Sequence, residues 1–254
     1  MLRKFQFGKF SLISLLALTT LLVAGGQLLY QTRLPDDSKI EQWGVLASVQ
    51  DEEAAQSLLK AAKSGSNLAA RALGQTLIRR PDEVSVLEGQ RWLQRAAESG
   101  DAKANLLLGK LLLKGAPGIP ADALAAGPWL EASVKGGQTG GAHYLGLIYR
   151  QEFPSQPRSP EKALYWLEMA AKAGIADSQF LLGQMLMTGD GIAPDPDRAR
   201  IWFEAAAEQD HPEANLQLLM AYTRNELGLK RNAEAEARQL MEAQHSLRHR
   251  PPAP

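Results

Sequence analysis

Apolar and small side chains recur along this chain with the three- and four-residue spacing of amphipathic helices. In the segment 160–174 they share one helical face, at Ala163, Trp166, Leu167, Ala170 and Ala171. Pro160 suits the first turn of a helix, with Ser159 before it as a possible N-cap. Gly174 suits a left-handed stop, and a second apolar segment, 176–189, also ends at glycine. The pattern predicts two helices joined by a tight turn.

This unit repeats along the chain. Tryptophans occur at intervals of 37, 37 and 36 residues, at Trp92, Trp129, Trp166 and Trp202. Eight residues after each tryptophan stands a turn residue: Gly100, Gly137, Gly174 and Asp210. A fifth copy without its tryptophan fits between Ala54 and Gly74, and a degenerate sixth starts near Ala235, with Arg238 in the tryptophan position. A fixed period of this length is the signature of stacked helix pairs.

A glycine recurs inside the second helix of three copies, at Gly109, Gly146 and Gly183. Glycine inside a helix costs about 1 kcal/mol relative to alanine, so its recurrence needs a structural reason. We expect a neighbouring helix to approach closely at each of these positions. We also expect the tryptophans to be structural and to fill the space that the small residues leave.

The consensus AxxWxxxAAxxGxxxAxxxLGxxxxxG resembles the Sel-one-like repeat, a relative of the tetratricopeptide repeat, over about residues 51–225. Two segments depart from it: 129–146 lacks the double alanine, and 151–160 lacks the paired glycines. The resemblance implies an all-α, right-handed α-solenoid, which we place at 51–245 with a C-terminal capping helix. We expect ten or eleven helices after the N-terminal segment. It also implies a module that binds a protein or peptide partner on its curved face.

The N-terminus carries Arg3, Lys4 and Lys9, followed by an uncharged run from Phe10 to Gln31. This run exceeds the roughly 20 residues that span a bilayer. We expect residues 1–32 to form a transmembrane signal anchor in a bacterial inner membrane, with the repeats in the periplasm. The alternative is a signal peptide cleaved near Ala24-Gly25-Gly26 and a protein secreted to the periplasm. We interpret residues 33–50 as a polar linker and 246–254 as a disordered tail.

Composition narrows the possible chemistry. The chain has 28 basic and 28 acidic residues, so no basic excess points to nucleic acid. It has no cysteine, which excludes disulfides, thiolate chemistry, cysteine-bound metals and a lipid anchor on cysteine. The protein must therefore rely on packing alone.

We identify no catalytic residues and expect no metal and no small-molecule cofactor. His245 and His249 have helical spacing but fall in the predicted tail, and His211 precedes Pro212 at a helix entrance. Asp195 and Asp197 lack a calcium-loop pattern and suit the start of a helix instead. The protein is therefore predicted not to be an enzyme, although a cell-wall or glycan-acting enzyme is an alternative.

Specificity should come from positions that differ between copies, because the shared positions build the core. Five, six and ten residues after each turn residue the copies differ, and the polar members of this stripe are the candidate partner-binding residues His143, Gln179, Gln184 and Asn215. The simplest alternative is an ordinary solvated stripe. The resemblance implies a membrane-anchored adaptor in an envelope process such as polysaccharide export, signalling or surface assembly. A purely structural organiser of a membrane complex is a third hypothesis.

Overall fold

A computed structural model describes residues 34–151, 153, 157–230 and 232–248. These residues form twelve α-helices and no β-strand. The helices are α2 (Asp37–Ser48), α3 (Glu52–Lys63), α4 (Asn67–Leu77), α5 (Glu83–Glu98), α6 (Ala102–Lys114), α7 (Ala123–Lys135), α8 (Gly140–Arg150), α9 (Pro160–Lys172), α10 (Ala176–Thr188), α11 (Pro196–Ala207), α12 (Pro212–Arg224) and α13 (Ala233–Arg248).

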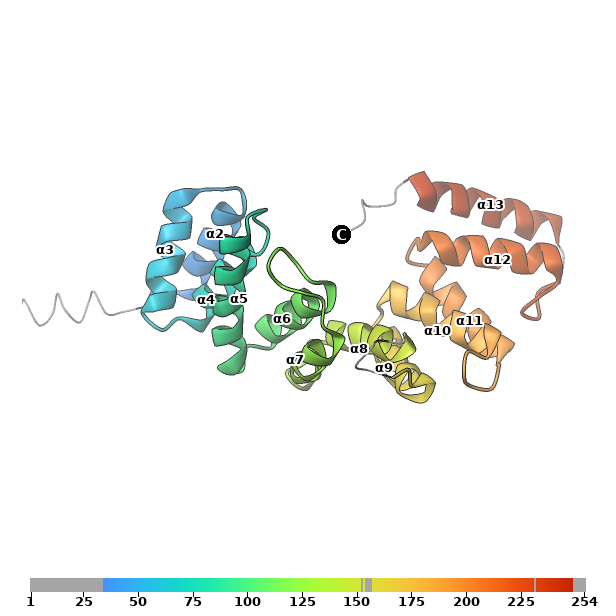
Figure 1. Cartoon of the computed structure of the whole chain (residues 1–254). Helices are drawn as coiled ribbons and strands as arrows, with labels where there is room; N and C mark the ends of the chain where they lie inside the picture. Colours follow the sequence, from blue (N-terminus) through green and yellow to red (C-terminus); the bar gives the residue numbers. More distant parts are fainter. Residues whose placement is uncertain (1–33, 152, 154–156, 231, 249–254) are drawn as a thin grey trace, which may run out of the picture.

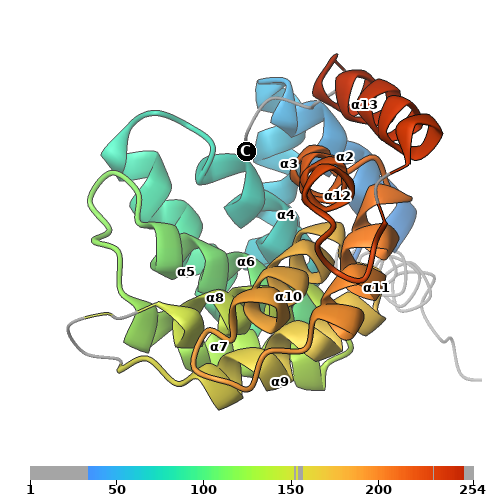
Figure 2. The same cartoon turned by 90° about the vertical axis from the view of Figure 1, so that its right-hand side faces the viewer.

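The helices stack in chain order into an arch. From α3 onward each helix packs mainly on its two neighbours in sequence, and contacts between helices two apart are few. Both views place α7 and α9 on the outer side of the arch and α6, α8 and α10 on the inner side (Figures 1 and 2). The prediction of an all-helical solenoid is confirmed, and its right-handed sense stays a prediction.

Sharp turns join the helices of each pair as the sequence predicted. Gly100 has φ of +92°, and Asp210 takes the same left-handed region with φ of +58°. The next residue then caps the following helix: Asp101 accepts a 2.9 Å hydrogen bond from the amide of Ala104. His211 caps α12 in the same way, through Nδ1. Pro160 begins α9, although Ser159 makes no side-chain capping bond.

The interior glycines lie where successive helices approach closely, which confirms that prediction. A Cβ built on Gly146 would lie 2.6 Å from the Leu167 side chain of the next helix. The same contact recurs at α4, α6 and α10, in the pairs Gly74–Leu93, Gly109–Leu130 and Gly183–Phe203. Each large residue in these pairs is fully buried. The glycine therefore leaves room for one large side chain from the following helix.

The prediction that tryptophans fill this space is wrong. The residue that packs on the glycine is the one directly after each tryptophan, as Leu167 follows Trp166. The tryptophans themselves are half-buried and pack at the edge of the core. Consecutive helical side chains point about 100° apart, so the residue after each tryptophan can face the core while the tryptophan itself points toward the edge.

The predicted linker at 33–50 is also wrong, because most of it is helix α2. Asp36 caps this helix by accepting a 2.8 Å hydrogen bond from the amide of Lys39. Ile40 is 1% exposed and Ala47 2% exposed, and α2 packs against both α3 and α4. The apolar residues of this stretch have helical spacing, which its many polar residues obscured. Partly for this reason the described chain has twelve helices instead of ten or eleven.

The C-terminal helix α13 also runs further than predicted, to Arg248, and Ser246 within it is 2% exposed. The start of the predicted disordered tail therefore belongs to a packed helix. The rest of that tail, residues 249–254, lies outside the described residues, as does the predicted membrane segment 1–32. Within the described part of the chain, no helix is long and apolar enough to cross a membrane.

We predict that Gly146→Ala lowers the free energy of unfolding by about 1–3 kcal/mol, because the added methyl group overpacks the contact with Leu167. The matched control is Gly44→Ala in α2, where the new Cβ would lie 3.4 Å from the Ala72 Cβ in ordinary contact. That change should raise stability by up to about 1 kcal/mol. Denaturant unfolding of both variants measures the effect. Equal stability changes in the two variants would contradict the packing argument.

Candidate functional site

Helices α4, α6, α8, α10 and α12 present a row of side chains that are exposed or half-buried. Relative to the buried glycine of each helix, these residues lie three before, one after and five after, and in α12 Leu219 takes the glycine position. We call this set the inner face: Arg71, Gln75 and Arg79; Leu106, Lys110 and Lys114; His143, Leu147 and Gln151; Phe180, Gln184 and Thr188; Leu216, Met220 and Arg224. Three of the helices that carry it, α6, α8 and α10, lie on the inner side of the arch (Figure 1).

Contacts between neighbouring repeats order this face. Arg71 Nε donates to Asp101 Oδ2 at 2.8 Å, with both side chains largely buried. The Phe180 ring stacks on His211 with 4.8 Å between ring centroids. The inner face is therefore a fixed surface that continues from one repeat to the next.

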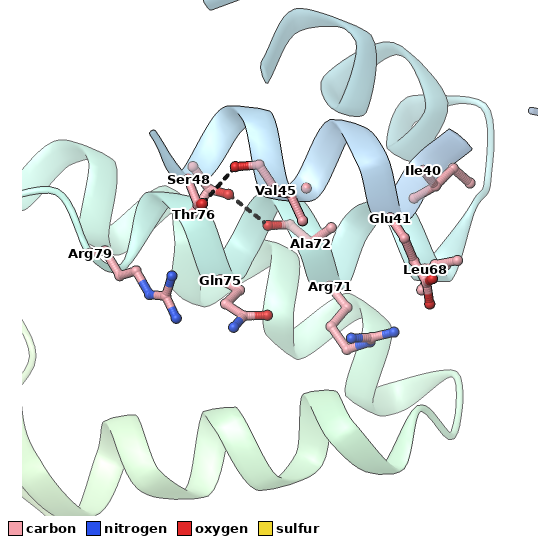
Figure 3. Close-up of a pocket in the computed structure, with 11 residues that line it drawn as sticks. Ile40, Glu41, Val45, Ser48, Leu68, Arg71, Ala72, Gln75, Thr76 and Arg79 are labelled. Carbon is pink, nitrogen blue, oxygen red and sulfur yellow. Dashed lines mark hydrogen bonds between the residues drawn. The ribbon is translucent and has the colours of Figure 1, made fainter. Parts of the chain in front are cut away.

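A pocket of about 380 Å³ lies at the N-terminal end of the inner face, between α2 and α4 (Figure 3). Arg71 and Gln75 of α4 stand in a row at this pocket with Arg79, which lies in the turn after the helix. Apolar side chains from both helices form much of its wall, including Ile40, Val45, Leu68 and Ala72. The pocket thus combines an apolar wall with a polar and basic edge.

A second hollow, of about 300 Å³, lies where α8, α10 and α12 meet. Its lining residues are His143, Asp177, Phe180, Leu181, His211 and Glu213. His143 Nδ1 lies 2.8 Å from the hydroxyl of Ser178. Burial lowers the pKa of His143 below its ordinary value, while the Asp177 carboxylate opposes this shift and the Lys110 ammonium adds to it. His143 is therefore a neutral hydrogen-bonding group in this hollow at neutral pH.

The serine–histidine contact resembles a nucleophile paired with a base. Ser178 is fully buried, however, so a substrate has no access to its hydroxyl. Within the described residues, no group of three or more histidine, aspartate and glutamate side chains is arranged to hold a metal ion. The geometry of the inner face fits binding and offers no assembled catalytic group.

Two of the four predicted partner-binding residues belong to the inner face. His143 and Gln184 are partly exposed there, and Gln184 accepts a hydrogen bond of 3.4 Å from Arg150 Nη2. Their role in partner binding stays a prediction.

The other two predicted residues are buried, so the expectation of a solvated stripe is wrong for them. Gln179 is 6% exposed, donates to the Ala171 carbonyl at 3.2 Å and accepts from Gln209 Nε2 at 2.7 Å. Asn215 is 1% exposed and accepts from Gln239 Nε2 at 2.8 Å. The predicted stripe combines the residues five and six positions after each turn residue. Because the helix turns about 100° per residue, the first of them faces the core.

Sequence reasoning missed the basic part of the inner face and the α2–α4 pocket. Arg79 lies outside the predicted stripe. The pocket depends on α2, which falls in the segment predicted to be a linker. The stripe ten residues after each turn already aligns Gln75 with Lys110, and extending it by four residues aligns Arg79 with Lys114. That alignment is the signal that identifies the face.

The described architecture agrees with comparisons to known proteins. The family model of the Sel1 repeat matches residues 82–101, 102–137, 140–175 and 176–211, together just over half of the chain. The crystal structure of a Sel1 repeat protein from Oxalobacter formigenes is similar, with a TM-score of 0.68 and 25% sequence identity over 90% of this chain and 95% of that one.

The crystal structure of an immunity protein from Pseudomonas aeruginosa is also similar, with a TM-score of 0.53 and 13% identity over 85% of each chain. At this identity the likeness concerns the fold alone. No curated protein matches the chain.

We predict that His143→Gln reduces the loss of stability on acidification. The ordinary pKa of histidine is 6.5, and the folded value lies below it. As the pH falls through 6.5 toward the folded pKa, the unfolded chain binds a proton that folded His143 does not. Wild-type stability therefore falls in this window, and the variant lacks that contribution.

Denaturant unfolding from neutral to mildly acidic pH measures the difference. His245→Gln, at an exposed position of α13, controls for the loss of one histidine. If the His143 variant and the wild type lose stability in parallel, His143 is not the group responsible.

Proposed function

This chain belongs to the Sel1 repeat family of helical binding modules, and on that premise we propose that it is a membrane-anchored adaptor that docks a protein partner on its inner face. The continuous inner face is the observation that carries this proposal. Its residues are not those that build the repeat, and they come from corresponding positions of five helices and their C-terminal ends. Solenoids of stacked repeats commonly present such an extended concave surface to partners.

The inner face also has the mixed character of a docking surface. Arg79 and Lys110 are exposed at one end, and Met220 is 43% exposed on α12. Apolar contacts supply affinity in protein interfaces, and charged groups supply specificity and association rate. A purely polar surface would lack the apolar contacts that supply affinity, and a purely apolar surface would lack the charged groups that supply specificity.

The proposed location rests on the N-terminal sequence. Positive charges followed by an apolar run and then the repeats favour insertion into the inner membrane with the repeats in the periplasm. The adaptor would then act in an envelope process, for which polysaccharide export, signalling and surface assembly are the candidates. Anchoring would hold the inner face near partners in or beside the membrane.

We expect Met220→Glu to weaken partner capture about tenfold, because it places a charge on the apolar part of the inner face that Leu216 and Met220 form on α12. The matched control is Ile201→Glu on α11, a helix that carries no inner-face residue, where the side chain is 55% exposed. The measurement is co-purification of partners from detergent-solubilised membranes, with variants that melt like the wild type. Capture that tolerates Met220→Glu but requires residues 249–254 would assign binding to the tail instead.

We expect the C-terminus to lie outside the cytoplasm. A reporter enzyme that is active only in the cytoplasm should be silent when fused there, and one active only in the periplasm should be active. Strong cytoplasmic signal would reverse the proposed topology. A soluble product beginning near Gln27 would replace the anchor with a cleaved signal peptide.

A further inference from the structure

We propose that the N-terminal part of the inner face binds an acidic segment of a protein partner, with one apolar side chain of that segment in the α2–α4 pocket. This inference rests on the proposed function, since it takes the inner face as the docking surface. It adds the chemistry of the ligand and the residues that select it.

The charge on the inner face is one-sided. Five of its fifteen positions are basic and none is acidic, although the chain has equal numbers of acidic and basic residues. Four of the five basic residues come from α4 and α6 or their ends: Arg71 lies on α4 and Arg79 in the turn that follows it, and Lys110 and Lys114 lie on α6. A surface with one sign of charge attracts a partner of the opposite sign and disfavours a like-charged one.

Two acidic residues lie near this basic group, and they identify which cations a ligand can use. Asp101 pairs with Arg71, so that guanidinium already has a carboxylate partner. Glu41 contributes to the pocket from α2. Arg79 and Lys110 remain exposed to solvent, and the Lys110 Nζ lies 5.2 Å from the centre of the Tyr144 ring, in a cation–π contact. Arg79 and Lys110 are therefore the main carboxylate-binding groups.

The pocket supplies the apolar half of the recognition. Its wall includes Ile40, Leu68 and Ala72, and Val45 is 68% exposed beside them. Covering this exposed apolar surface with a side chain of the partner is favourable. Arg79, in the turn after α4, lies at the same pocket, so a carboxylate next to the inserted residue meets a guanidinium (Figure 3).

The pocket also distinguishes a protein segment from other polyanions. None of its lining residues is aromatic, so nucleic-acid bases would find no stacking platform there. An aliphatic pocket beside an arginine fits a segment that alternates apolar and acidic residues. We therefore commit to an acidic protein segment as the occupant.

The test uses the full chain in detergent and a fluorescein-labelled peptide of alternating glutamate and leucine. Arg79→Glu and Lys110→Glu should each raise the Kd about tenfold. Lys135→Glu, at an exposed position on the outer helix α7, should leave the Kd unchanged. Added salt should weaken binding, because the contacting charges are exposed.

The pocket is tested separately with Val45→Glu, a change at an exposed position that should weaken binding severalfold without unfolding the protein. A peptide with glycine in place of leucine should lose a similar factor. Equal binding of a peptide with lysine in place of glutamate would overturn the proposal. So would an oligonucleotide that binds more tightly than the acidic peptide and is blocked by the same variants.

Failure of this inference differs from failure of the proposed function. If Met220→Glu abolishes partner capture while the acidic peptide fails to bind, the scaffold stands and the inferred ligand chemistry is wrong. If the acidic peptide binds and Arg79→Glu releases it, the inferred site is supported, whether or not Met220 takes part in capture.

Discussion

The contact between an interior glycine and a large side chain of the next helix is the constraint on which this architecture depends. At four junctions the same geometry recurs, from Gly74 with Leu93 to Gly183 with Phe203. Without a Cβ on the first helix, the second approaches until its leucine or phenylalanine fills the space. Because this contact recurs at the same position of each repeat, successive helix pairs pack with the same relative orientation. The arch results from that repetition.

The repeat period made the fold predictable, but it did not predict which residue within one turn of a helix faces the core. The glycines, the tight turns and the helix pairs all follow from spacing that several copies share. The role of Leu167 in the core did not follow from this spacing, because the rarer tryptophan beside it, Trp166, marks the repeat more clearly than a leucine does. The prediction that Gln179 lies on the surface failed for a related reason. Adjacent residues of one helix, such as Gln179 and Phe180, face the core and the inner face respectively. Helix α2 was missed because it carries no copy of the full pattern.

The proposed function uses the positions that the repeat leaves undetermined. The core positions must be small or apolar in every copy, so they carry little information about a partner. The inner face differs between copies and is nevertheless held in a fixed order by contacts such as Arg71 with Asp101. The basic character of α4 and α6 and the apolar character of α12 therefore stand at defined places along one surface. A partner would meet different chemistry at the two ends of the same arch.

The last junction is built differently. Leu219 replaces the glycine in α12, and Gln239 of α13 stands where the other repeats have leucine or phenylalanine. The buried amides of Asn215 and Gln239 join the two helices there instead of a large apolar side chain. Hydrogen-bonded amides require a specific partner geometry, whereas apolar side chains accept many neighbours. The α12–α13 junction therefore differs chemically from the junctions before it: α13 fits this position, and a copy of the ordinary repeat could not take its place without leaving an amide unmatched.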